Sequence, residues 1–152
     1  MPATADFPLA AKRHWHDADL LEKNGRAGNA GQLYGFSAEC GIKALLVSLG
    51  YPTETDGSPV WKPPAGVPKI REHVQKLVNT IGDIRNYAHN VQGRNGAKYT
   101  ALIPNITNFS DWATDHRYWA DADIPNSLPG WKVAAKEVMG MLDSASLDGV
   151  LK

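Results

Sequence analysis

The sequence contains a single cysteine, Cys40, among 152 residues. One thiol excludes an internal disulfide and a zinc site built from several cysteines. The chain also lacks an excess of either charge, because 16 lysines and arginines balance 16 aspartates and glutamates. A surface that is basic all over is therefore excluded, and a polyanion would have to bind at a local patch.

Long apolar runs are missing as well. No segment approaches the roughly 18 consecutive apolar residues of a membrane-spanning helix. The first residues lack the basic-then-apolar order of a signal peptide. These features predict a cytoplasmic protein without a membrane segment, and a length of 152 residues suits one domain, 1–152, with its core over about 8–145.

Several catalytic and cofactor motifs are absent. The sequence contains no P-loop, no GxGxxG fingerprint, no GxSxG nucleophile elbow and no HExxH zinc motif. His14 and His16 flank Trp15, but a spacing of two residues points their imidazoles to different faces of a helix. We therefore expect no metal site and no bound cofactor.

Helical periodicity is the main pattern that the chain does contain. Apolar residues recur at intervals of three and four over 8–23, 28–49, 69–91 and 129–148. The second segment is apolar almost all round, which predicts a buried central helix whose glycines allow close approach of a neighbour. Gly82 interrupts the third segment, and residues 92–96 predict a turn.

Between the second and third segments, residues 51–68 are rich in proline and glycine and predict a long loop. No segment shows the strict alternation of a strand. The fold class that follows is all-α, with four main helices packed as a bundle.

Residues 84–91 hold the side chains best suited to chemistry. Arg85 and His89 lie four apart, and hence on one face of the third helix. The guanidinium can bind a phosphate and stabilise its charge, the imidazole can transfer a proton, and Asn86 can position either group. RNA carries its own nucleophile, the 2′-hydroxyl, so its cleavage needs no metal. The alternative is an ordinary polar helix edge.

Glu39 and Lys43 are a second candidate polar group, four apart on the second helix. In this order they form a favourable helical ion pair. They are either a surface pair or a polar element that faces the helix of Arg85.

His116 and Arg117 are a third candidate group, beside Tyr118 and Trp119. The basic pair can bind phosphate, and the neighbouring rings can stack on a base. The alternative is that the rings pack in the core while the charges face solvent.

Several of these segments together resemble the HEPN family of helical nucleotide-binding domains. Residues 34–46 resemble the family's helix of pattern E-x-x-L-K-A-L-L, with Ile42 where leucine is usual. Residues 85–89 are similar to its Arg-polar-His motif, and 115–118 to an Arg-Tyr pair of some members. The resemblance implies a four- or five-helix up-and-down bundle. It also implies a homodimer in which the motif helices of two subunits face each other across a cleft.

From this resemblance we expect a protein that binds or cleaves RNA or a nucleotide. As an enzyme it would be a metal-independent endoribonuclease of a toxin or defence type, with His89 as general acid and base and Arg85 and Asn86 at the phosphate. The alternative is a non-catalytic module that binds a nucleotide or a nucleotidyltransferase partner. Only three residues separate Arg85 from His89, fewer than is usual in the family, and this favours the alternative. The expected nucleotide- or RNA-binding residues are Glu39, Lys43, His116, Arg117 and Tyr118.

Overall fold

The computed structural model describes residues 3–151, and this part of the chain is helical. It contains no strand there beyond an isolated bridge between Thr53 and Pro59, so the expected all-α class is confirmed. The α-helices are α1 (Phe7–Lys23), α2 (Ala27–Ser48), α3 (Val74–Asn79), α4 (Ile81–Gln92), α5 (Arg94–Thr100) and α6 (Leu128–Leu147). Short 3-10 helices lie between α5 and α6: η1 (Ile106–Asp111), η2 (Thr114–Tyr118) and η3 (Asp121–Asp123).

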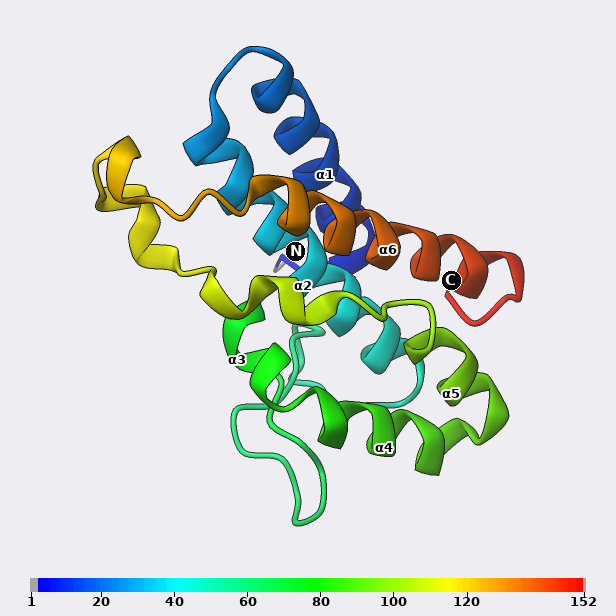
Figure 1. Ribbon diagram of the computed structural model, residues 1–152. Coiled ribbons are helices and arrows are strands. Elements are labelled where there is room, and N and C mark those ends of the chain that lie inside the picture. Colours follow the sequence, from blue (N-terminus) through cyan, green and yellow to red (C-terminus); the bar gives the residue numbers. More distant parts are fainter. Residues whose placement is uncertain (1–2, 152) are drawn as a thin grey trace.

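Helix α2 lies in the middle of the molecule, as its all-round apolar sequence predicts. Figure 1 shows α1 on one side of it, α3 to α5 on the other, and α6 crossing it. The crossing is close because α2 presents glycine to α6. A Cβ at Gly31 would lie 2.7 Å from the Trp131 ring, and one at Gly41 would overlap Val138. The predicted use of these glycines in close helix contact is confirmed.

The predicted helix over 69–91 is in fact two helices. Residues 69–73 precede α3, and the chain leaves helical geometry at Thr80, with φ −111° and ψ 18°. The Thr80 hydroxyl donates to the Lys76 and Leu77 carbonyls, both at 3.3 Å, which satisfies carbonyls at the end of α3. Gly82 lies inside the first turn of α4, so the interruption comes two residues earlier than the glycine predicts.

The predicted turn over 92–96 is shorter than expected. Only Gly93 turns the chain, with φ +57°, a value that favours glycine, and α5 begins at the next residue. Helix α5 then packs against α4, where Gly96 lies against the carbonyl of Ala88 so closely that any side chain would clash. The result is a helical hairpin.

The predicted long loop is closed at its ends and held to the residues before α3 by specific contacts. The Tyr51 hydroxyl donates to the Pro68 carbonyl at 2.5 Å and so joins the two ends of the loop, and the Arg71 guanidinium stacks on the Trp61 ring at 3.9 Å. Arg71 also donates to the Pro59 carbonyl at 3.3 Å. Over residues 3–151, none of the helices combines the length and apolarity needed to cross a bilayer.

Candidate functional site

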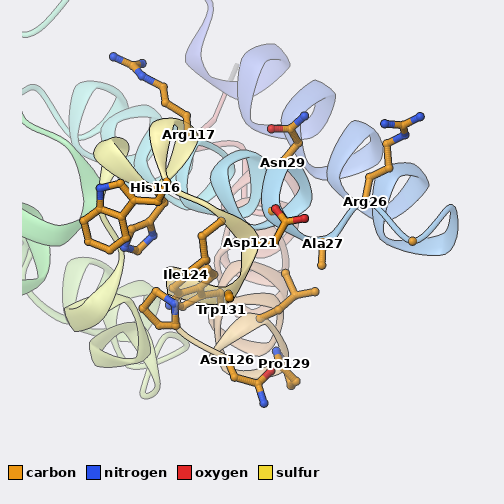
Figure 2. A pocket seen from close by; sticks show the side chains of 16 residues that line it. Arg26, Ala27, Asn29, His116, Arg117, Asp121, Ile124, Asn126, Pro129 and Trp131 are labelled. Carbon is orange, nitrogen blue, oxygen red and sulfur yellow. The ribbon is translucent and has the colours of Figure 1, made fainter.

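A pocket opens where α2 and α6 begin. Its volume is about 730 Å³, and η2 and η3 complete its wall. Figure 2 shows the side chains that line it. The first turn of α2, the 116–126 segment and the first turn of α6 each contribute, so segments about 90 residues apart in the sequence meet here. The lining residues are Gly25, Arg26, Ala27, Gly28, Asn29, His116, Arg117, Trp119, Asp121, Ala122, Ile124, Pro125, Asn126, Leu128, Pro129 and Trp131.

Trp131 provides a rigid aromatic wall of this pocket. Its indole Nε1 donates to Asp111 Oδ1 at 2.9 Å, and the hydroxyl of Ser127 donates to the other carboxylate oxygen of Asp111. Its ring packs on the backbone of α2 at Gly31, where no side chain fits. Hydrogen bonding and packing therefore hold the indole in one orientation before any ligand arrives.

His116 stacks on this tryptophan and is itself only 3% exposed. Its ring lies 5.8 Å from Trp131 at an interplanar angle of 22°, and 4.7 Å from Trp119 at 55°. Burial lowers the pKa of His116, against the opposing effect of the Asp111 and Asp115 carboxylates. The imidazole is therefore favoured in its neutral form, with one nitrogen donating and the other accepting.

The Nδ1 atom of His116 is buried and has no hydrogen-bond partner within the described chain. An unpaired buried polar atom costs about 1–3 kcal/mol, and native proteins rarely leave one without a role. Because His116 lines the pocket, a ligand or a water that reaches this nitrogen would remove that cost. This atom is the strongest sign of a binding function in the structure.

Charged side chains occupy the rim of the pocket. Arg26 and Arg117 are both exposed, and Figure 2 shows their guanidinium groups extending away from the aromatic wall. Arg117 lies over the Tyr118 ring at 4.8 Å. Tyr118 itself is 74% exposed and does not line the pocket. Asp121 is the one carboxylate of the lining, so cations outnumber anions two to one.

Glu39 and Lys43 lie elsewhere, on the part of α2 that faces α3. Lys43 Nζ donates to Glu39 Oε2 at 3.0 Å, and the two side chains are only 9% and 11% exposed. His73, the residue before α3, places its Nδ1 3.0 Å from Glu39 Oε1 and is 58% exposed. The predicted pair therefore forms, but as a buried pair that positions a histidine, and neither member lines the pocket.

Arg85, Asn86 and His89 all lie on α4, as predicted, but their side chains have different surroundings. Arg85 is half-buried, donates to the Ile103 carbonyl at 3.3 Å and lines a shallow hollow against α5. Asn86 lines another hollow, against residues 65–68 of the long loop. His89 is exposed near the end of the helix. Arg85 and His89 share a helix face, and Asn86 is turned toward a separate surface.

Sequence reasoning found three members of the pocket and missed others. His116 and Arg117 were expected to bind nucleotide and Trp119 to stack on a base, and all three line the pocket. Arg26 and Asp121 were missed, because each lies outside a periodic segment and nothing in its local sequence indicates a partner. His73 was also missed as a partner of Glu39, since 34 residues separate them. Only the fold brings these side chains together.

No group of three or more histidine, cysteine, aspartate or glutamate side chains that could hold a metal occurs in the part of the chain that the structure describes. Comparison with family models, with curated proteins and with solved structures finds no match for this chain.

Proposed function

We propose that this protein binds a nucleotide, free or as part of an RNA strand, in the pocket between the beginnings of α2 and α6. The observation that carries the proposal is the buried, unpaired Nδ1 of His116 within an aromatic pocket. A nucleotide combines a planar ring with polar edges and a negative phosphate. The pocket offers a counterpart to each of these features.

The base has aromatic surface to stack on. Trp119 is 47% exposed while still lining the pocket, and stacking of a base on such a ring contributes about 1–3 kcal/mol. The phosphate has the guanidinium groups of Arg26 and Arg117, which can bind it through two parallel hydrogen bonds each. This arrangement agrees with the zero net charge of the chain, because the positive charge is needed only at the rim.

Calorimetric titration tests the proposal with the four ribonucleoside monophosphates and a short single-stranded RNA. We expect the wild type to bind, and Trp119→Ala to bind roughly tenfold more weakly. Trp61→Ala is the matched control, because Trp61 is similarly exposed, at 57%, but lies in the long loop. Equal affinities of both variants and the wild type would contradict the proposal.

A second candidate function is metal-independent endoribonuclease activity on α4. It is favoured by Arg85 and His89 sharing one face of a continuous helix, with His89 exposed to solvent. In this mechanism Arg85 stabilises the phosphate, His89 transfers the proton and the RNA 2′-hydroxyl is the nucleophile.

Incubation of a mixed RNA pool in EDTA tests this activity. Cleavage that leaves cyclic phosphate ends, lost in Arg85→Ala and His89→Ala but kept in the exposed-histidine control His16→Ala, would support it. Absence of cleavage by the folded wild type would exclude it and leave the non-catalytic binding module.

We also propose the up-and-down bundle that the resemblance to the HEPN family implies, and a cytoplasmic location. The same resemblance supports a homodimer that brings two α4 helices together and, for the non-catalytic module, a nucleotidyltransferase partner. Light scattering tests the dimer, because a pair has twice the monomer mass of 16.5 kDa. A mass of one chain at working concentration would contradict it.

A further inference from the structure

We propose that the pocket selects guanine, with the Asp121 carboxylate accepting hydrogen bonds from the N1–H and N2–H groups of the base. The inference rests on the proposed nucleotide binding and adds a base preference to it. It follows from the position of Asp121, from the absence of a protein partner for its carboxylate, and from the donor pattern of the four bases.

Asp121 is a solvent-exposed acceptor in the wall of the pocket. Among the residues that the structure describes, no side chain or backbone N–H bonds to its carboxylate, and neither Arg26 nor Arg117 forms an ion pair with it. Its backbone is held in η3, where its carbonyl accepts from the Ile124 N–H at 3.3 Å. Figure 2 shows the side chain between Ile124 and the first turn of α2.

The position of Asp121 also determines where the phosphate goes. Asp121 Oδ1 lies beside Gly28, 3.6 Å from where a Cβ would be, so the positive end of α2 already has a negative charge next to it. A phosphate placed there would be repelled. The phosphate is therefore better placed at the arginines of the rim, which leaves the base to the part of the pocket lined by Trp119 and Asp121.

Guanine is the base whose edge matches a carboxylate. Its N1–H and N2–H groups are adjacent and parallel, and so can meet both carboxylate oxygens. Adenine and cytosine present an amino group beside a ring nitrogen acceptor, and uracil presents one N–H between two carbonyl oxygens. In each of these three, an acceptor faces the second carboxylate oxygen, which is unfavourable because two acceptors repel each other.

The buried imidazole of His116 provides a second polar contact in the same interior. Its unpaired Nδ1 can donate to an acceptor of the ligand or accept from a donor, according to which nitrogen carries the proton. The O6 and N7 atoms of guanine are both acceptors. Guanine can therefore meet the carboxylate with one edge and an imidazole donor with another.

The test compares GMP with AMP, CMP and UMP by calorimetric titration, for the wild type, Asp121→Asn and Asp123→Asn. Asp123 is the matched control, since it is an exposed acid of the same short helix that does not line the pocket. We expect the wild type and Asp123→Asn to favour GMP by about tenfold, and Asp121→Asn to lose this preference. The preference for GMP is lost because the side-chain nitrogen of asparagine is a donor, and it would face the N1–H or N2–H donor of guanine.

Two outcomes would overturn the inference while leaving nucleotide binding intact. One is equal binding of all four nucleotides by the wild type. The other is tighter binding of all four by Asp121→Asn, which would mean that Asp121 only repels phosphate at α2. Binding of no nucleotide by the folded wild type would overturn the proposed function itself.

Discussion

Replacement of Gly31 by alanine tests whether the backbone of α2 positions the aromatic wall of the pocket. The new Cβ would lie 2.7 Å from the Trp131 ring, closer than carbon atoms approach in proteins. The indole cannot move aside freely, because its Nε1 is bonded to Asp111 and its ring lies against His116. Gly31→Ala is therefore an overpacking change at a constrained site.

The effect of Gly31→Ala on the free energy of unfolding is the sum of three contributions. Overpacking typically costs about 1–3 kcal/mol, and a weakened hydrogen bond adds about 1 kcal/mol. The higher helix propensity of alanine offsets about 1 kcal/mol. The free energy of unfolding should fall by roughly 1–3 kcal/mol. Gly140→Ala in α6 should instead raise it by about 0.5–1 kcal/mol, because nothing lies within 4 Å of the added Cβ.

Urea denaturation followed by far-UV circular dichroism measures both variants against the wild type. The two glycines both lie within long helices, so their helix-propensity gains cancel in the comparison. Stabilisation of Gly31→Ala to the same extent as Gly140→Ala would refute the reasoning. We also expect Gly31→Ala to bind nucleotide more weakly than Gly140→Ala, since only the first displaces Trp131.

Two further predictions concern buried charged and titratable groups. Lys43→Met should lower the free energy of unfolding by roughly 3–5 kcal/mol, because it leaves the Glu39 carboxylate buried without its cation. Lys23→Met, at a lysine that is 71% exposed, should cost less than about 1 kcal/mol in the same denaturation assay. His116 has a lowered pKa, so the unfolded chain binds its proton more readily, and stability should fall as the pH drops below 6.5. His116→Phe should show a smaller fall in urea titrations between pH 7 and pH 5, and an unchanged fall would contradict this.

The long helices could be predicted from sequence because each has a continuous apolar pattern. Helices α1, α2 and α6 begin and end within about two residues of the predicted bounds. A break was expected at Gly82, but its place at Thr80 could not be predicted, because the apolar stripe continues across this threonine and its hydroxyl contacts are not visible in the sequence. Helix α5 was missed because Gly93, just before it, and Gly96, inside it, favour a turn in isolation. Its packing against α4 overrides that preference.

The candidate site was less predictable than the fold. His116 and Arg117 could be found because a basic pair beside aromatic residues is a local signal. Arg26 and Asp121 contribute through their positions in space, and these depend on how α2, η3 and α6 meet. Whether a charged pair is buried is likewise a property of packing. Glu39 and Lys43 have the spacing of a surface pair, yet α2 is covered along that face.

The break at Thr80 has a consequence for motion. Of the twelve residues of α4, only Ile84 and Ala88 are buried, whereas fourteen residues of α2 are. Helix α5 is held by its buried Tyr99, whose hydroxyl donates to Asp148 at 2.7 Å. Local opening of α4 alone exposes little apolar surface, so α4 should separate from the rest at a fraction of the global unfolding free energy. Its amide hydrogens should exchange with solvent well before those of α2. Arg85 and His89 thus lie on the part of the molecule that can change its orientation while the pocket between α2 and α6 keeps its shape.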